Sequence, residues 1–198
     1  MSDSIWSATL EQFRDRMASH EPVPAGVTAA AVSATLALAL LSKVLQVTLR
    51  HKDFTGDREL VGALLDDTRN LFGILGHLAD DDVAAFQDYL ECLRNHQSTG
   101  SALRKTIDVP LNVARSASLG IALCETSAGH VHAVVAPDLG VASSLLEGAV
   151  RSTLVTLKSN LQQLPSGDPY RNEVTDEAAR LAAKSERRPP AVVADERL

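Results

Sequence analysis

The stretch EPVPAGVTAAAVSATLALALLSK, residues 21–43, decides how this chain folds. It holds seventeen consecutive uncharged residues, 26–42, directly after a Pro-x-Pro, although the chain has a formal net charge of −6. Such a run forms a membrane span, a buried helix or the wall of a binding site. It is borderline for a span, which needs about 20 predominantly apolar residues, and its many Ala, Ser and Thr residues add little transfer energy. We therefore predict a buried helix from about Thr28 to Leu49, and no membrane partner.

Small residues recur at every fourth position of this helix and again in a last helix predicted over Leu139–Gln163. Rows of small side chains let two helices approach near the short end of the usual spacing of roughly 8–10 Å. The two helices are therefore candidates to pack on each other through these rows, which are Ala25, Ala29, Ser33 and Ala37 in the first helix and Gly140, Ser144, Gly148 and Ser152 in the second.

Hydrophobic periodicity predicts further helices along the chain. One covers residues 4–19, and another runs for more than thirty residues over 60–93, as one long helix or two nearly collinear ones. After a loop at 95–101 comes a helix that contains Pro110. Proline breaks or bends a helix, so we expect a kink there or a restart with Asp108 as its cap.

Residues 126–138 form an irregular segment with room for a short extended piece, and an amphipathic helix is expected within 173–187. Aromatic residues make up only 4% of the chain while Ala and Leu abound, which favours helices over a sheet core. We predict an all-α fold, a helical bundle with long antiparallel helices. One domain would cover residues 1–165, followed by a partly disordered C-terminal extension over 166–198.

Charge and cysteine content restrict the class of protein. The sequence pI of about 5.5 gives no net positive field for phosphate, so nucleic acid is not expected as a partner. Cys92 and Cys124 are two lone cysteines without a CxxC motif, which indicates a reduced, cytoplasmic compartment. The N-terminal residues carry no basic stretch followed by an apolar core, so no secretory signal is predicted.

The sequence contains no phosphate-binding glycine loop, GxSxG, HExxH or zinc spacing, so the candidates for chemistry are single polar residues in apolar surroundings. Asp82 falls on the apolar stripe of the long helix. An inward carboxylate costs desolvation energy unless it is paired, which favours a functional role. The alternative is that residues 80–82 cap a new helix at a break. Asp138 begins the last helix, either as its cap or as a carboxylate held where it can move a proton.

Other polar residues have simpler interpretations. His130 and His132 could form a metal pair, but two loop histidines without a third ligand predict no metal site. Thr156 and Asn160 lie one turn apart on the last helix within an apolar run. The cations at 50–52 close the buried helix, where they suit the helix dipole.

Three segments, in this order and spacing, resemble the cyclodeaminase/cyclohydrolase family. They are PVPAGVTAAAVSATLALALLSKVLQVTLRHK (22–52), DVPLNVARSA (108–117) and DLGVASSLLEGAVRSTLVTLKSN (138–160). The family includes the cyclodeaminase part of formiminotransferase-cyclodeaminase and the methenyltetrahydrofolate cyclohydrolase of methylotrophs. The resemblance implies an all-helical fold, a homodimer and a folate pocket at or near the dimer interface. It also implies chemistry that opens or closes a five-membered ring at N5 and N10 of tetrahydrofolate, with a small-molecule substrate and no metal or redox cofactor.

Taken residue by residue, the resemblance implies three catalytic groups. Asp138 would handle the proton, Lys52 would steady charge on the ring or water, and Asp82 would hold a neighbouring group or share the proton transfer. The implied substrate-binding residues border the ligand or support the site, and they are Pro24, Gly26, Thr28, His51, His132, Gly140, Arg151, Thr156 and Asn160.

The chain departs from the family pattern at several of these positions. Only Gly26 remains of three glycines before the buried helix, Val27 adds a branched side chain there, and His132 and Val134 replace two asparagines. Three functions therefore stay open. The first is a folate one-carbon cyclohydrolase or cyclodeaminase, the second is acid–base cyclisation or elimination on another amine- or imine-containing small molecule, and the third is a non-catalytic dimeric binding scaffold.

Overall fold

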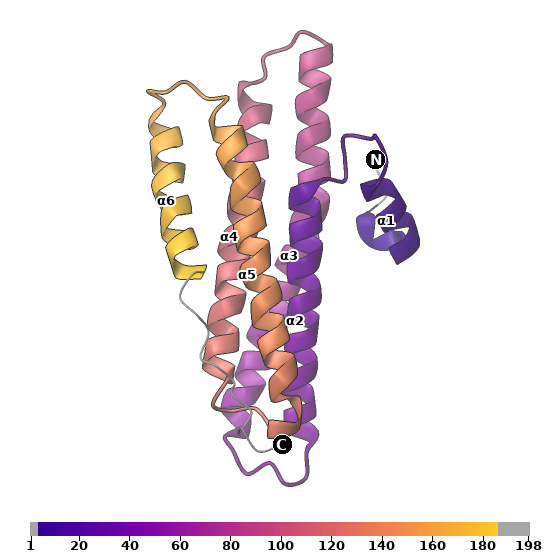
Figure 1. Ribbon diagram of the computed structural model, residues 1–198, viewed down its shortest axis with the longest axis vertical. Coiled ribbons are helices and arrows are strands. Elements are labelled where there is room, and N and C mark those ends of the chain that lie inside the picture. Colours follow the sequence, from indigo (N-terminus) through magenta and orange to yellow (C-terminus); the bar gives the residue numbers. More distant parts are fainter. Residues whose placement is uncertain (1–3, 186–198) are drawn as a thin grey trace.

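The computed structural model of the chain describes residues 4–185, and every regular element in that range is a helix. Four long helices form an antiparallel bundle (Figure 1): α2 (Gly26–Arg50), α3 (Arg58–Arg94), α4 (Gly100–Ser127) and α5 (Ala136–Leu161). The shorter elements are η1 (Ile5–Ser7), α1 (Leu10–Met17), η2 (Ala133–Val135) and α6 (Pro169–Ser185). α6 lies beside α4 and α5, and α1 stands away from the bundle on the other side. The predicted all-α bundle is confirmed.

The four long helices share one continuous apolar core. α2 and α4 both pack between α3 and α5. Among the large side chains that are fully buried are Leu38, Leu41, Leu75, Ile121 and Leu146. Gly120 of α4 belongs to the tightest part of the core, because a Cβ built there lies 2.9 Å from a methyl of Leu146 and 3.1 Å from one of Leu38. α2 is the predicted buried helix.

α3 is one continuous helix of 37 residues, which decides between the two alternatives left by the sequence. Asp57 caps its start, where the side chain accepts hydrogen bonds from the N–H groups of Glu59 and Leu60, both at 3.0 Å. Residues 80–82 therefore lie inside a helix and do not cap a new one. The carboxylate of Asp82 needs another explanation.

The prediction that Asp108 caps a helix restarted at Pro110 is wrong, because α4 passes through Pro110 without interruption. Proline has no N–H, so the carbonyl of Thr106, four residues earlier, lacks its helical donor. The side-chain amide of Asn160 in α5 donates a hydrogen bond to that carbonyl at 2.7 Å. A second helix thus compensates for the proline, while Asp108 accepts a hydrogen bond from the hydroxyl of Tyr170 in α6.

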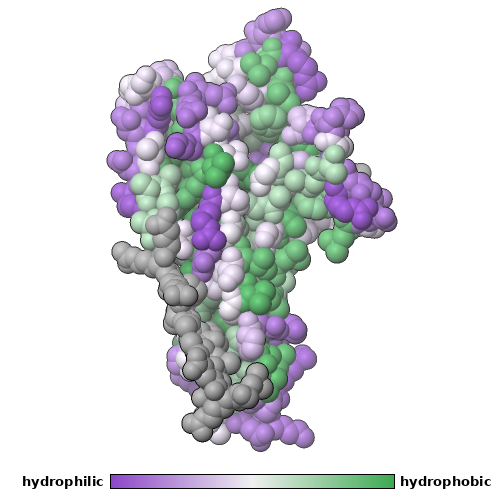
Figure 2. Space-filling view, in the orientation of Figure 1, coloured by the Kyte–Doolittle hydropathy of each residue, from purple (hydrophilic) through white to green (hydrophobic). Residues whose placement is uncertain are grey.

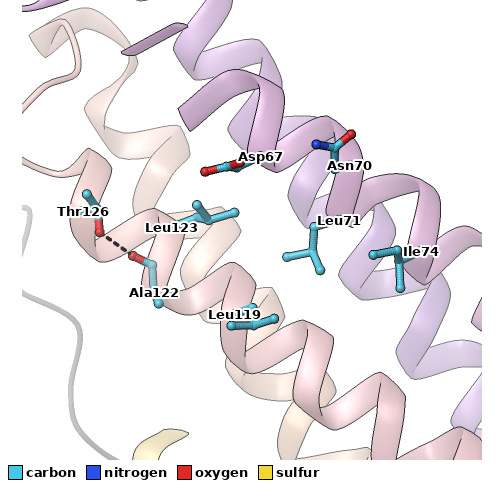
Figure 3. Close-up of a pocket in the computed structure, with 8 residues that line it drawn as sticks. All are labelled: Asp67, Asn70, Leu71, Ile74, Leu119, Ala122, Leu123 and Thr126. Atoms are coloured by element: carbon cyan, nitrogen blue, oxygen red, sulfur yellow. Dashed lines mark hydrogen bonds between the residues drawn. The ribbon is translucent and has the colours of Figure 1, made fainter. Parts of the chain in front are cut away.

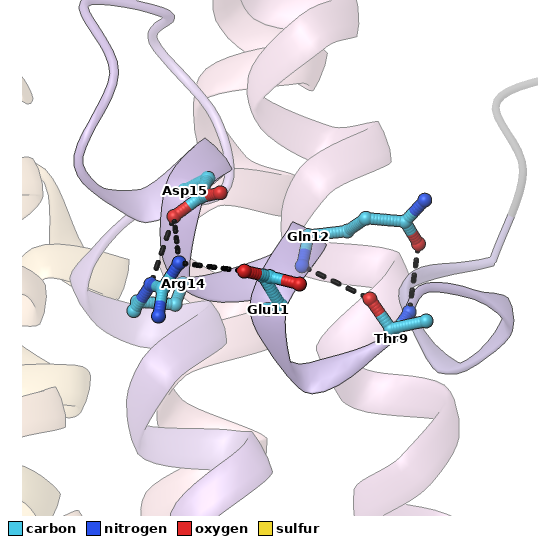
Figure 4. Close-up of polar contacts among 5 residues, drawn as sticks. All are labelled: Thr9, Glu11, Gln12, Arg14 and Asp15. Carbon is cyan, nitrogen blue, oxygen red and sulfur yellow. Dashed lines mark hydrogen bonds and ion pairs between the residues drawn. The ribbon is translucent and has the colours of Figure 1, made fainter.

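The helix predicted over residues 4–19 is wrong in part, because the chain forms η1, breaks and then forms α1. Thr9 and Gln12 form a capping box at the break (Figure 4). The Thr9 hydroxyl accepts from the Gln12 N–H at 3.1 Å, and the Gln12 side chain accepts from the Thr9 N–H at 2.8 Å. α1 has no buried residue, and Leu10 is 79% exposed. The expected apolar stripe on this helix does not face a core.

α5 begins at Ala136, three residues before the predicted start, so Asp138 is its third residue and not its cap. The predicted contact between α2 and the small-residue row of α5 is also wrong. A Cβ built on Gly140 or Gly148 meets no atom within 4 Å, which places this row on the outer side of the helix. α5 buries a different side, which includes Leu139, Ala142 and Leu146.

Three segments are long and apolar enough to cross a membrane by length and composition alone: Gly26–Arg50, Gly100–Ser127 and Ala133–Leu161. In the first two, the bundle buries more than half of the most apolar window, 56% and 61%. In the third it buries 39%. The core therefore accounts for much of the hydropathy of α2 and α4, whereas α5 keeps apolar residues on its outer side.

The amphipathic helix expected within 173–187 corresponds to α6, which starts earlier, at Pro169. No strand occurs within residues 4–185, and the irregular segment before α5 contains only the short η2 turn. The last residues of the predicted C-terminal extension, 186–198, lie outside the part of the chain that the structure describes.

Candidate functional site

The structure separates most of the predicted site residues into two groups at opposite ends of α2. The start group lies at the beginning of α2 and comprises Gly26, Thr28, Asp82 and Thr156. The end group lies toward the other end and comprises His51, Lys52, His132 and Asp138. Between Thr28 and His51 the helix rises about 35 Å, at 1.5 Å per residue. One copy of the chain therefore does not bring the two groups into one pocket.

A carboxylate bound to the first turn of α2 dominates the start group. The Thr28 hydroxyl donates a hydrogen bond to Asp82 Oδ2 at 2.6 Å, and Thr28 is fully buried. Thr28 is the third residue of α2, so its N–H has no partner inside the helix. That N–H also acts on the Asp82 carboxylate, where it lowers the pKa. Since Ala25 supplies no side-chain cap, Asp82 caps α2 from a neighbouring helix.

The environment of Asp82 changes its acidity. Burial raises the pKa of its carboxyl above the ordinary value, and the side-chain and backbone hydrogen bonds from Thr28 act in the opposite direction. A half-buried carboxyl whose pKa is raised by burial is a candidate to exchange a proton with a bound molecule. Because α3 is continuous, the structure excludes the alternative of a cap at residues 80–82, and the functional role of Asp82 stays a prediction.

α5 contributes a second hydroxyl to the start group. A Cβ built on Gly26 would lie 3.7 Å from Thr156 Oγ1, so the two residues are neighbours across the α2–α5 contact. Gly26 is exposed, and Pro24, two residues before it, is buried. Asn160 lies one turn beyond Thr156, and its amide is bonded to the carbonyl of Thr106.

An ion pair holds the carboxylate of the end group. Lys43 Nζ lies 3.2 Å from Asp138 Oδ2, with 62% and 39% of the two side chains exposed. Asp138 therefore stands at the solvent boundary beside a cation that sequence reasoning missed. The sequence did mark this residue, because Lys43 is the first charged residue after the uncharged run 26–42. Lys52 is exposed and forms no ion pair within residues 4–185.

Two stacked histidines join the loops that meet at the end group. The ring centroids of His51 and His132 are 3.6 Å apart with an interplanar angle of 21°. Nδ1 of each ring accepts a backbone N–H, from Asp53 at 3.4 Å and from Val134 at 3.3 Å respectively. The buried hydroxyl of Thr48 accepts a hydrogen bond from the backbone N–H of His132 at 3.0 Å. Within residues 4–185, Nε2 of neither ring forms a hydrogen bond.

An apolar face lies between the two groups, and we call it the α2–α5 face. In Figure 1 the two helices run side by side in front, and Figure 2 shows green and pale side chains over much of them. Leu36 is 51% exposed and Val155 is 72% exposed. Arg151, one of the predicted site residues, is exposed on α5. The outward residues of this face include Ala29, Ser33, Leu36 and Leu40 of α2 and Val141, Leu145, Gly148 and Val155 of α5.

A separate groove between α3 and α4 is less suited to chemistry (Figure 3). It has a volume of about 350 Å³ and an apolar lining that includes Leu71, Ile74 and Leu119. The hydroxyl of Thr126 donates to the carbonyl of Ala122 at 3.0 Å. Asp67 and Asn70 are the other polar lining residues, and the lining holds no cation to stabilise a developing negative charge.

Comparisons with known proteins agree with one another. The family model described as formiminotransferase-cyclodeaminase matches residues 9–180. The chain is 29% identical over 167 residues to a methenyltetrahydrofolate cyclohydrolase from Methylorubrum extorquens, which covers 79% of this chain and 80% of that protein. Its fold matches the crystal structure of formiminotetrahydrofolate cyclodeaminase from Thermotoga maritima with a TM-score of 0.85 and 22% identity, over 92% of each chain.

Proposed function

The chain belongs to the formiminotransferase-cyclodeaminase family, and from that membership we propose that it acts on a one-carbon derivative of tetrahydrofolate. The proposed reaction is hydrolysis of 5,10-methenyltetrahydrofolate or cyclisation of 5-formiminotetrahydrofolate with release of ammonia. The observation that carries the proposal is the part-buried hydrogen bond between Thr28 and Asp82, because it holds a carboxyl of raised pKa at the start of α2.

Hydrolysis of the methenyl bridge requires two proton movements. Water adds to the bridging carbon and loses one proton to a base. The resulting hydroxyl then loses its proton as the carbon–oxygen double bond forms, the bond from carbon to one ring nitrogen breaks, and that nitrogen takes up a proton. The overall reaction consumes one water molecule and releases one proton. Two carboxylates in different environments can divide these roles, and here Asp82 is half-buried while Asp138 is paired with Lys43 at the solvent boundary.

Cyclisation of a formimino group needs the same kinds of group. N10 attacks the formimino carbon on N5 and loses its proton, and the formimino nitrogen must gain protons so that its bond to carbon breaks and it departs as ammonia. A cation such as Lys52 can stabilise negative charge on the substrate in either reaction. The proposed chemistry uses side chains alone, with no metal or redox cofactor.

We also propose that the working unit is a homodimer formed through the α2–α5 face. This explains why the start group lies, along α2 in one copy, about 22 Å from Lys43, the partner of Asp138, and about 35 Å from His51. In a two-fold dimer the same patch faces itself. An axis near the middle of α2 would place the start group of one copy beside the end group of the other, at both ends of the interface. The exposed Leu36 lies near that middle.

The first test is the near-ultraviolet absorbance decay of 5,10-methenyltetrahydrofolate with the purified protein. We expect decay above the uncatalysed rate, reduced about 10²–10⁴-fold in Asp82→Asn and in Asp138→Asn because each removes an acid–base group. Asp66→Asn is the matched control, since it removes an exposed carboxylate of α3 that is paired with Arg69. Ammonia release from 5-formiminotetrahydrofolate is measured in parallel. Baseline rates with both substrates would contradict a folate reaction and favour a different amine- or imine-containing substrate.

The second test mixes two inactive variants. Asp82→Asn lacks the start-group carboxylate and Asp138→Asn lacks that of the end group. If each site takes one group from each copy, equal mixing and re-association restore about a quarter of the wild-type activity, because half of the dimers are mixed and each mixed dimer has one intact site. If each copy holds a complete site, no activity returns. That result would contradict the shared site without contradicting the reaction.

A further inference from the structure

A hollow between α5 and α6 has no part in the proposed reaction. Its volume is about 370 Å³. Leu154 and Leu161 of α5 and the alanines of α6, such as Ala178 and Ala182, give it an apolar wall. Lys158 and Arg171 also line it. The hollow therefore combines an apolar surface with positive charge.

The way α6 is attached explains why the space exists. α6 is anchored on α4, where Arg115 donates two hydrogen bonds to Glu177 and the Tyr170 hydroxyl donates to Asp108. Val174 is buried in the same contact region. α6 also packs on α5, where Val174 and Ala178 join the apolar cluster of Leu157 and Leu161, and the side of α6 that faces the hollow carries alanines. The contacts with α4 and α5 hold α6 in place, and the short alanine side chains leave the hollow beside Leu154 and Leu161 unfilled.

Positive charge predominates among the described residues that line the hollow. No carboxylate is among its lining residues, and within residues 4–185 Lys158 forms no ion pair. Arg171 Nη1 donates a hydrogen bond to the carbonyl of Leu164 at 3.0 Å. The other N–H groups of this guanidinium form no hydrogen bond within residues 4–185 and can donate to a ligand. Arg151 lies two turns before Lys158 on the same helix. Figure 2 shows a hydrophilic strip between α5 and the pale green surface of α6. In a chain of net charge −6, these cations point to an anion.

We propose that the hollow between α5 and α6 binds an organic carboxylate with an apolar body. The carboxylate would accept hydrogen bonds from Lys158 and Arg171, while the body would cover Leu154, Leu161 and the alanines of α6. The volume corresponds to about twelve water-sized groups at roughly 30 Å³ each. A saturated chain of about ten carbons with its carboxylate has this size.

Calorimetric titration of the full chain with sodium decanoate tests the proposal. We expect saturable binding of one decanoate per chain, and a dissociation constant raised about tenfold or more in Lys158→Gln, because a charge-assisted hydrogen bond is lost. Lys184→Gln is the matched control, since Lys184 is exposed on α6 and does not line the hollow. 1-Decanol, with the same chain and no charge, should bind more weakly than decanoate.

Ala178→Leu provides an independent check, because it fills the hollow without changing charge. It should abolish decanoate binding while the helical circular dichroism stays at the wild-type level. The proposal is overturned if decanoate does not bind, if Lys158→Gln and Lys184→Gln bind equally, or if decanol binds as tightly as decanoate. None of these results depends on folate turnover, so this site and the proposed function can fail separately.

Discussion

At the scale of single residues, Asp82 has two effects of opposite sign on folding. Its carboxylate caps α2 by accepting hydrogen bonds from Thr28. Its burial raises its pKa, so the folded state favours the protonated form. The stability that this preference contributes is present below the unfolded-state pKa and is lost as the pH rises through the folded-state value. At neutral pH the ionised group therefore lowers the free energy of unfolding.

Asp82→Asn should expose this effect. Asparagine keeps an oxygen for the Thr28 donors and never ionises. The free energy of unfolding of the variant, relative to wild type, should rise as the pH is raised from below the ordinary Asp value of 3.8 to pH 7. Urea unfolding at a series of pH values measures the difference. A relative stability that is flat with pH, or that falls, would show that burial does not control the acidity of Asp82.

How far the sequence predicts individual residues depends on whether their signal is local. Asp82 interrupts an apolar stripe, and that pattern alone marks it as inward. Lys43 pairs with Asp138 from another helix, and Thr48 accepts the N–H of His132 from a loop 84 positions away. The ion pair and the hydrogen bond arise only when distant segments meet. Their partners could not be read from spacing along the chain.

At the scale of helices, Pro110 and Asn160 form one unit. Asn160→Ala should lower the free energy of unfolding by about 1–3 kcal/mol, because it leaves the carbonyl of Thr106 unpaired. In a Pro110→Ala background the same substitution should cost less, since alanine supplies the missing N–H. Urea unfolding of the two single variants and the double variant gives the coupling. Additive effects would mean that Asn160 does not replace the bond that proline removes.

Two glycines inside helices should respond to alanine in opposite ways. Gly120→Ala should destabilise by about 1–3 kcal/mol, because its Cβ would lie 2.9 Å from Leu146. Gly62 of α3 has no atom within 4 Å of a built Cβ, so Gly62→Ala should stabilise by up to about 1 kcal/mol through helix propensity. Thermal unfolding of both variants beside wild type separates the two effects. The same sign for both would contradict the packing at Gly120.

Helices were predictable where the apolar period was strong, as in α2 and α3. The restart considered at Pro110 does not occur, and the sequence could not show this because the donor to the Thr106 carbonyl belongs to α5. The error at the N-terminus was avoidable. Thr9 followed three residues later by Gln12 is the sequence signature of a capping box, and it marks a new helix start inside the segment predicted as one helix.

At the scale of the whole molecule, the proposed dimer makes a direct prediction. Leu36→Arg should give a monomer in analytical ultracentrifugation with unchanged helical content, because a two-fold axis near Leu36 would bring two like charges together. Leu93→Arg is the control, since Leu93 is 47% exposed and lies near the end of α3. A dimeric Leu36→Arg protein, or a monomeric wild type, would contradict association through the α2–α5 face.

The separation of the site into two groups follows from the length of α2. Residues 24–28 and 50–52 lie at the two ends of α2, which has 25 residues. A rigid helix of this length holds its ends apart. The resemblance to the family implies that residues from both ends of α2 belong to one site. Such a site can form only if one copy of the chain supplies the start group and a second copy supplies the end group. The outward direction of Gly140 and Gly148 required the structure, because spacing on one helix does not reveal which side its neighbours cover.

The hydrogen bond from Asn160 to the carbonyl of Thr106 also limits how this chain can change over generations. A proline that arises at position 110 without an amide at position 160 leaves a buried carbonyl unpaired. An asparagine at 160 opposite a helix without that proline has no vacant carbonyl to fill. Pro110 therefore destabilises the protein least when Asn160 is present, and the Asn160 amide finds its acceptor only when Pro110 is present. In diverging lineages, Pro110 and Asn160 should therefore be gained and lost together, although they lie on different helices.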